Sequence, residues 1–255
     1  HPIVFGPLVF SALGYHLWFL GFLFVFATIT VPLFTWLKKD AGKRWVASLA
    51  RLTEWRGGLL LLTLPLIFSR LVLQPFFPDY TGWSDFSFML IFFVLGYVLM
   101  ADERFMQAIR RDGLLYLVLA LACKLLFLSA AVGAPVIEWM MSPGTPGFVL
   151  FWAVFGVNAW CWTMVMFNLG MRFLDFSNRL LAYSREASFP VFWIHYPVTF
   201  FVAFYVVQWQ VSLPIKMGAM IAGSFVLTLG LYELLVRHIN PVRRLFGMRP
   251  KRKPQ

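Results

Sequence analysis

The stretch SDFSFMLIFFVLGYVLM, residues 84 to 100, decides the class of fold, because its one charged residue is Asp85, near the start. A run of this length approaches the roughly 20 apolar residues that a helix needs to cross a bilayer. Further apolar runs follow the same pattern along the chain: 17–37, 57–77, 114–133, 147–170, 187–209 and 213–236. We therefore predict an all-α protein, a polytopic bundle with about seven transmembrane helices.

The composition and the placement of charge agree with a membrane protein. Of the 255 residues, 60% are hydrophobic and only 13% are charged, far from the values of a soluble domain. A net charge of +11 could indicate nucleic-acid binding, but the basic residues are not spread evenly. There are 22 basic residues, and only Arg70, Lys124 and Lys216 lie outside every second connection and the tail. The others lie in segments 38–56, 104–111, 172–185 and 237–253. The positive-inside rule makes these segments cytoplasmic, so the charge reports topology, and we expect no nucleic-acid partner.

The chain shows no soluble domain and no repeat. We predict a single membrane domain over residues 1–255, ending in a basic, disordered cytoplasmic tail at 245–255. The connection 37–56 is either an interfacial helix on the inner leaflet or a solvated linker helix. Cys123 and Cys161 lie within apolar runs, so we expect them to pack as small side chains, with no disulfide framework and no metal cluster.

Several polar residues inside the apolar runs need a physical reason: Arg70, Lys124, Asn158, His195 and Glu233. A charge at mid-membrane costs roughly 2.5–3.5 kcal/mol. Lys124 lies about ten residues into its run, where its stem reaches neither surface easily. Asn158 is more readily a helix-to-helix hydrogen-bond partner than a functional group. Arg70 lies nearer the outer end of its run, and it either binds an anion or reaches the outer headgroups. Glu233 most simply forms a helix-surface ion pair with Arg237.

His195 lies in FPVFWIHYPVTF, residues 189 to 200, between Pro190 and Pro197. Each proline removes a backbone donor, so we expect a kinked helix whose freed carbonyls line a cavity. The histidine is then a general base, a ligand-orienting group or a packed, hydrogen-bonded side chain. His16, in GYHLWFL, is the other histidine with context, and its alternative is a residue of the membrane interface.

Three blocks of sequence resemble the integral-membrane acyltransferase-3 family, and within it the branch named glucan biosynthesis protein C. They are GYHLWFLGFLFVF (14–26), EASFPVFWIHYPVTFF (186–201) and LGLYELLVRHINPVRRLF (229–246), and the resemblance covers essentially the whole chain. It implies an O-acyltransferase for groups other than amino-acyl groups. Such an enzyme moves an acyl group, of acetyl or succinyl type, from acyl-CoA to a carbohydrate hydroxyl of a periplasmic or cell-surface glycan, and it uses no metal.

The resemblance also implies a place and a pocket. The protein would be a multi-pass protein of the bacterial inner membrane, surrounded by lipid, with its C-terminus in the cytoplasm. His16 and His195 fall on matching family positions and are expected in the substrate pocket, while Arg70 would bind a phosphate or carboxylate. The catalytic histidine and arginine motif of the family has no match in this chain. We therefore expect this chain to correspond to the C-terminal seven of about ten spans. Such a part of the enzyme could be inactive alone.

A transporter or flippase is the rival class. Arg70, Lys124 and His195 would then line a substrate or proton path, although no inverted repeat is visible. A seven-helix receptor or retinal protein is a third alternative, but Lys216 is poorly placed for a Schiff base.

Overall fold

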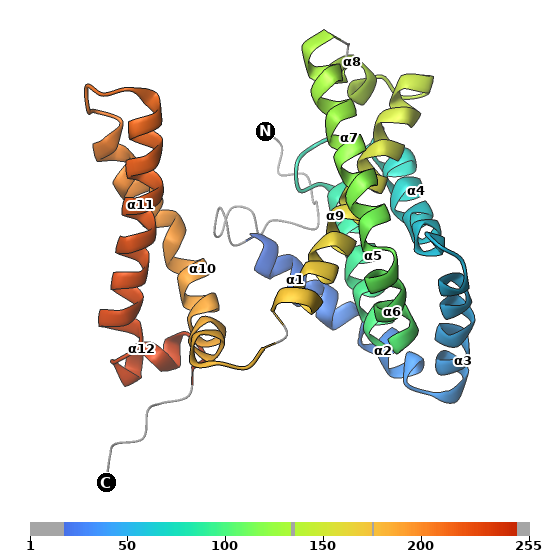
Figure 1. Ribbon diagram of the computed structural model, residues 1–255, viewed down its shortest axis with the longest axis horizontal. Coiled ribbons are helices and arrows are strands. Elements are labelled where there is room, and N and C mark those ends of the chain that lie inside the picture. Colours follow the sequence, from blue (N-terminus) through green and yellow to red (C-terminus); the bar gives the residue numbers. More distant parts are fainter. Residues whose placement is uncertain (1–17, 134–135, 175, 249–255) are drawn as a thin grey trace. The chain divides into compact units, whose positions relative to one another are not determined.

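The computed structural model describes residues 18–133, 136–174 and 176–248, and they form helices joined by short connections (Figure 1). No strand occurs in these ranges, which confirms the predicted all-α class. The chain divides into two compact units, unit 1 over residues 1–175 and unit 2 over residues 176–255. Each unit has its own buried cluster of side chains. The single membrane domain expected over residues 1–255 stays a prediction.

Unit 1 is a helical bundle built around its longest helix, α9. In chain order its helices are α1 (Trp18–Ile29), α2 (Val31–Leu37), α3 (Asp40–Leu49), η3 (Ala50–Glu54), η4 (Gly58–Leu62), α4 (Thr63–Leu73), α5 (Trp83–Met100), α6 (Glu103–Arg111), α7 (Gly113–Gly133), α8 (Val136–Met141) and α9 (Pro146–Phe173). The helices η3 and η4 are short 3₁₀ turns. α9 packs against α4, α6, α7 and α8, and α4 packs against α5 as well.

Side-chain caps mark where several helices begin. The hydroxyl of Thr145 accepts a hydrogen bond from the backbone N–H of Phe148, and Pro146 is the first residue of α9. Asp102 caps α6 in the same way, and Asn178 caps the first helix of unit 2. Such residues satisfy backbone donors that have no partner within the helix, so they fix the starting points of the long helices.

Four described helices are long and apolar enough to cross a membrane: α5, α9, α10 (Arg179–Val206) and the helix formed by α11 (Leu213–Leu231) with η5 (Tyr232–Val236). The bent pair α1 and α2 makes five if it is one span. Two shorter apolar segments, at residues 58–73 and 113–128, do not meet the same length. The structure thus supports a helical membrane protein, but not the predicted number of about seven spans.

The break in unit 1 lies where the sequence did not lead us to expect one. α1 and α2 meet at Thr30 with a bend of 52°. Pro32, at the start of α2, has no N–H to donate to the preceding turn, which explains the interruption. The hydroxyl of Thr30 donates to the carbonyl of Phe26 at 2.6 Å, and the backbone N–H of Thr30 donates to the same carbonyl at 3.0 Å. A discontinuous helix is therefore present, but in the first apolar run.

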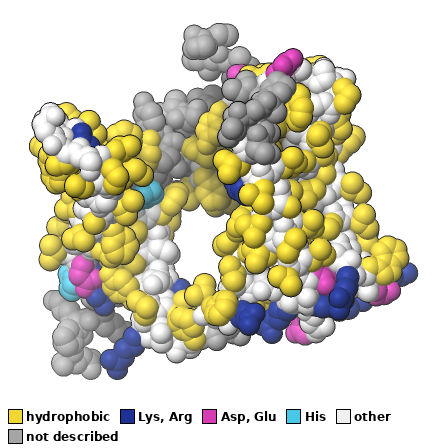
Figure 2. Space-filling model, turned by 45° about the horizontal axis from the view of Figure 1, so that its top comes forward, with side chains coloured by type: hydrophobic (Ala, Val, Ile, Leu, Met, Phe, Trp, Pro, Cys, Tyr) yellow, Lys and Arg dark blue, Asp and Glu magenta, His cyan; other side chains and the backbone are white. Residues whose placement is uncertain are grey.

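Apolar side chains cover most of the face of unit 1 seen in Figure 2. Leu114 is 74% exposed and Phe24 is 73% exposed, as expected where side chains face lipid. Lysine and arginine gather along the lower edge of unit 1 in that view. We call this edge, which carries the connections 38–56 and 102–112 and the end of α9, the basic end of unit 1.

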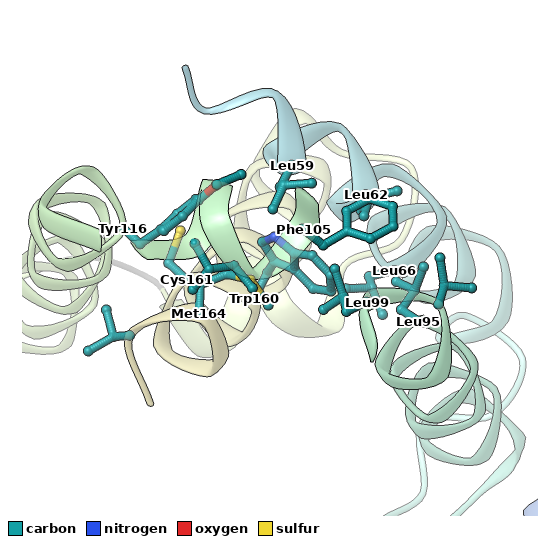
Figure 3. Packing of buried hydrophobic residues seen from close by; sticks show 14 of the residues in the cluster. Leu59, Leu62, Leu66, Leu95, Leu99, Phe105, Tyr116, Trp160, Cys161 and Met164 are labelled. Atoms are coloured by element: carbon teal, nitrogen blue, oxygen red, sulfur yellow. The ribbon is translucent and has the colours of Figure 1, made fainter. Parts of the chain in front are cut away.

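The core of unit 1 lies where α4, α5, α6, α7 and α9 meet (Figure 3). Trp160 of α9 is at its centre and is 1% exposed. It is surrounded by side chains that are at most 1% exposed: Leu66, Leu99, Phe105 and Tyr116. These side chains interlock helices that are distant in the sequence. They hold α4 against α5, which positions the polar residues at the opposite end from the basic connections.

Unit 2 is a hairpin of α10 and α11, followed by the π-helical turn η5 and the short helix α12 (Asn240–Leu245). Tyr232 and Val236 pack with Ala187 of α10 in a small buried cluster. Arg243 of α12 donates to Glu186 of α10 at 2.5 Å and joins the two helices. α12 is thereby tied to the start of the hairpin.

The helix α10 keeps both of its prolines inside one continuous helix. It runs without a break from Arg179 to Val206 and contains both Pro190 and Pro197. The prolines therefore do not interrupt the helix in this described segment, and the kink and cavity expected around His195 stay a prediction. α10 packs against α11 along the hairpin.

Candidate functional site

Arg70 lies in the last turn of α4, near the end of unit 1 opposite the basic end, and is only 5% exposed. Its Nη2 lies 2.7 Å from Oδ1 of Asp85 in the first turn of α5. The other carboxylate oxygen of Asp85 accepts from the backbone N–H of Thr81 at 2.7 Å. Thr81 has φ of 64°, a left-handed conformation that β-branched residues rarely adopt. The carboxylate thus holds both the buried cation and a strained loop.

A small polar network completes the surroundings of Arg70. Its Nη1 donates to Gln74 Oε1 and to Ser84 Oγ, both at 3.1 Å. Ser84 Oγ donates in turn to Gln74 Oε1 at 2.7 Å. A buried charge is tolerated when it is paired and hydrogen-bonded, and these contacts provide both conditions. The arrangement does not fit the alternative in which Arg70 reaches the lipid headgroups.

Aromatic rings enclose the guanidinium and form the wall of a cavity. Arg70 Cζ lies 4.4 Å from the ring centroid of Phe88, 5.1 Å from that of Trp152 and 5.4 Å from that of Phe155. A cavity of about 470 Å³, here called the Arg70 cavity, opens beside the ion pair. The residues that line it besides Arg70 and Asp85 are Phe19, Leu23, Phe26, Tyr80, Phe88, Met89, Phe92, Phe93 and Phe155.

Two buried donors near this wall have no acceptor among the described residues: Nε of Arg70 and Nε1 of Trp152. A buried N–H without an acceptor costs roughly 1–3 kcal/mol. Arg70 lines the cavity and Trp152 does not, so a ligand with hydroxyl or carbonyl oxygens would supply an acceptor for Nε of Arg70. Because Asp85 already neutralises Arg70, the cavity suits an uncharged polar ligand better than a free anion, and its aromatic walls suit the apolar face of such a ligand.

The other expected residues of unit 1 do not join this network. Lys124 is exposed on α7, among leucines that are exposed as well. Asn158 is half-buried in α9, and its Oδ1 is buried with no donor among the described residues. The interhelical hydrogen bond favoured for Asn158 is thus not formed through that oxygen. His16 lies outside the described residues, and Trp18, two positions later, contacts the ring of Tyr80 with centroids 5.8 Å apart.

His195 and Glu233 belong to unit 2. His195 is half-buried in α10, with Nδ1 2.7 Å from the carbonyl oxygen of Phe192. Glu233 forms the predicted ion pair with Arg237 and also accepts from the hydroxyl of Tyr183 at 3.2 Å. Glu233 therefore connects η5 to α10, which is a structural role. Within unit 2 the ring of His195 lies 5.7 Å from that of Phe192, so its near surroundings are aromatic.

A second buried carboxylate, Asp112, organises the basic end of unit 1. Its Oδ2 lies 2.7 Å from Nη2 of Arg111 and accepts from the backbone N–H of Gly57 at 3.0 Å. The hydrogen bond from Arg111 lowers the pKa of Asp112, and the Gly57 N–H acts in the same direction against the effect of burial. Arg111 also donates to the carbonyls of Thr53 and Trp55, at 2.8 and 2.9 Å. This pair fixes the connection between η3 and η4.

The fold and the site define a helical membrane protein in which an ion pair with no net charge is buried beside an aromatic cavity. No family model, no curated protein and no solved structure matches the chain.

Sequence reasoning identified Arg70 but not its partners. Ser84 and Asp85 open the apolar run 84–100 and Gln74 lies near the end of the run 57–77, but none of them was expected to contact Arg70. One signal was available, because Asp85 is the lone charge at the head of an otherwise apolar run that follows the loop after Arg70. A carboxylate and an arginine on either side of a short outer loop are placed to meet when the two helices are antiparallel neighbours.

Proposed function

We propose that the protein is a membrane-embedded O-acyltransferase of the bacterial inner membrane. It would move an acyl group of acetyl or succinyl type from acyl-CoA to a carbohydrate hydroxyl of a periplasmic or cell-surface glycan. The resemblance of the three sequence blocks suggests the reaction. The structural observation that carries the proposal is the Arg70 cavity, which combines donors, a carboxylate and aromatic walls.

We further propose seven spans, with the C-terminus in the cytoplasm. The bent pair α1 and α2 would form the first span, and η4 with α4 would form the second. The segment at residues 113–128 would be the fourth. The remaining four are the helices that already have sufficient length. The basic connections would then lie on one side, which agrees with the positive-inside rule.

The Arg70 cavity supports a carbohydrate as the acceptor. Sugars offer hydroxyls that both donate and accept, so Asp85 could accept from one hydroxyl while Arg70 Nε donates to another. The apolar face of a sugar ring packs well on aromatic side chains, and Phe88, Phe155 and the exposed Tyr80 supply them. The ion pair would hold these groups in position before the sugar arrives.

The transfer itself needs a base for the acceptor hydroxyl. The hydroxyl oxygen would attack the thioester carbonyl carbon, the C–S bond would break, and the proton removed from the hydroxyl would pass to the departing thiolate of CoA. The catalytic histidine motif of the resembled family has no match in this sequence. His16 and His195 would serve in substrate binding or proton transfer, as the resemblance implies. The Nδ1 of His195, if it donates to the Phe192 carbonyl, leaves Nε2 as the nitrogen that accepts a proton.

The experiment measures transfer of labelled acyl groups from several acyl-CoA donors to glycan by the full-length protein in membranes. Wild type is compared with His16→Ala, His195→Ala and Asp85→Asn at matched expression. His238→Ala is the matched control, because His238 is an exposed histidine outside the three proposed positions. Loss of transfer in the test variants with retained activity in the control supports the proposal. Absence of transfer by wild type with every donor would overturn it.

A transporter or flippase is the second candidate, and the bend between α1 and α2 favours it. Discontinuous helices in membranes commonly line substrate paths, and α1 contributes Phe19, Leu23 and Phe26 to the Arg70 cavity. Uptake or flipping of a labelled glycan by reconstituted protein, without acyl transfer, would support this class over the enzyme.

A further inference from the structure

Two small hollows adjoin at the basic end of unit 1, where α6, α7 and α9 meet. The first, of about 240 Å³, is lined by Arg110, Asn168, Met171 and Arg172. The second, of about 160 Å³, shares Asn168 and Arg172 with it. Together they form what we call the α6–α9 pocket, which has a polar part and an apolar part.

The pocket is built by a close contact between α9 and the end of α6. Asn168 Nδ2 donates to the carbonyl of Ile109 at 2.9 Å and to that of Arg110 at 3.3 Å. The first residue of α7, Gly113, makes this approach possible, because a Cβ at that position would lie 2.3 Å from Asn168 Nδ2. Arg110 is therefore held at a fixed place relative to α9 without any ligand.

The polar part carries positive charge that the described residues do not balance. Arg110 and Arg172 are exposed, and no described carboxylate lies within ion-pair distance of either. By contrast, their neighbour Arg111 is paired with Asp112 at 2.7 Å. Two guanidinium groups beside one amide are well suited to a phosphate, since each guanidinium can donate two parallel hydrogen bonds.

The apolar part indicates what carries the phosphate. The second hollow lies between α7 and α9 beside Arg172, and its apolar lining is Leu114, Leu117, Val165 and Leu169. Leu114 is 74% exposed and Leu169 is 41% exposed. Such a strip beside basic residues, on helices expected to cross a bilayer, fits the upper part of an acyl chain. A free phosphate would leave it uncovered.

We propose that the α6–α9 pocket binds one anionic phospholipid, with its phosphate between Arg110 and Arg172 and the start of an acyl chain against Leu117 and Val165. Basic pockets at the ends of transmembrane helices commonly recognise anionic headgroups. The proposal concerns a place distinct from the Arg70 cavity and does not depend on the acyl-transfer activity. The bound lipid would join α6 to α9 at the basic end.

The test measures lipid binding to the full chain in detergent by native mass spectrometry. The probes are phosphatidylglycerol, phosphatidylcholine with the same acyl chains, and inorganic phosphate. The double variant Arg110→Gln/Arg172→Gln is expected to lose phosphatidylglycerol affinity by about tenfold or more, since each basic residue near anionic lipid contributes substantially. The matched control, Arg44→Gln/Arg51→Gln, removes the same charge from exposed positions of the basic end and is expected to stay within about twofold.

A second variant addresses the apolar part without changing charge. Leu117→Trp fills the hollow and is expected to weaken phosphatidylglycerol binding while thermal unfolding in detergent stays near that of wild type. Equal binding of phosphatidylglycerol and phosphatidylcholine would overturn the proposal, as would equal effects of the two double variants. If inorganic phosphate displaced the lipid and bound with the same affinity as the lipid, the pocket would be a site for a soluble anion and the proposal would be wrong.

Discussion

Arg70 and Asp85 lie 2.7 Å apart across the loop that joins α4 to α5, and the side chains of both are at least 86% buried. Removing one partner of a buried pair leaves the other charge uncompensated, which typically costs about 3–5 kcal/mol. We expect Asp85→Ala to lower the free energy of unfolding by about 3 kcal/mol, and the double variant Arg70→Met/Asp85→Leu to cost less. Unfolding by denaturing detergent measures both. Arg104→Met, which removes an exposed pair with Asp102, is the control and should cost about 0–1 kcal/mol; a cost as large as that of Asp85→Ala would contradict the interpretation.

The contact between Gly113 and Asn168 predicts a strong position effect of alanine. Gly113→Ala would force a Cβ against the Asn168 amide, and we expect a loss of about 1–3 kcal/mol in unfolding free energy. Gly170, in α9, has open space around its Cα, so Gly170→Ala should be neutral or stabilise the helix by about 0.5–1 kcal/mol. Thermal unfolding of the two variants side by side in detergent checks the difference. Similar losses in both would mean that the close approach is absent.

Asp112 predicts a dependence of stability on pH. Its pKa is lowered in the folded protein, so its contribution is present above the unfolded value of roughly 3.9 and is lost as pH falls through the folded value. The pKa of Asp102 is also lowered, by Arg104, and Asp102 therefore acts in the same direction. We expect wild type to lose stability as the pH falls below about 4, and Asp112→Asn to show a smaller loss from a lower starting value. Chemical unfolding between pH 7 and pH 3 measures the difference, and identical slopes for the two proteins would refute the role of Asp112.

The proposed topology predicts which side of the membrane each loop faces. In a background without Cys123 and Cys161, single cysteines at Lys43 and Arg244 should react with an impermeant thiol reagent only after it gains access to the cytoplasm. A cysteine at Tyr80, which is 75% exposed, should react from the outside. Labelling of positions 43 and 80 from the same side would contradict an odd number of spans between them.

The sequence was sufficient where local composition decides the structure. The apolar run at residues 84–100 became α5, and the spacing of Glu233 and Arg237 became an ion pair. The helix and the ion pair depend on helix periodicity and on neighbours within one turn, and a single sequence contains both kinds of information.

Features that depend on contacts between distant segments could not be read in this way. The pairing of Asp85 with Arg70 requires knowledge of which helices are adjacent, and the boundary between loop and helix is uncertain by a few residues from sequence alone. The effect of each proline on its helix could not be predicted from the sequence either. Pro32 interrupts its helix, whereas Pro190 and Pro197 are accommodated within α10, and the difference depends on tertiary packing that the sequence pattern does not contain.

The length of α9 has a consequence for the surrounding bilayer. Its 28 residues extend for about 42 Å, against a hydrocarbon thickness of about 30 Å. The neighbouring α7, with 21 residues, extends for only about 32 Å. An ordinary tilt of about 20° removes little of this excess, so α9 must project beyond its neighbour. Asn168 and Arg172 lie in the last turns of α9, so this excess length would lie in the headgroup layer and not in the hydrocarbon.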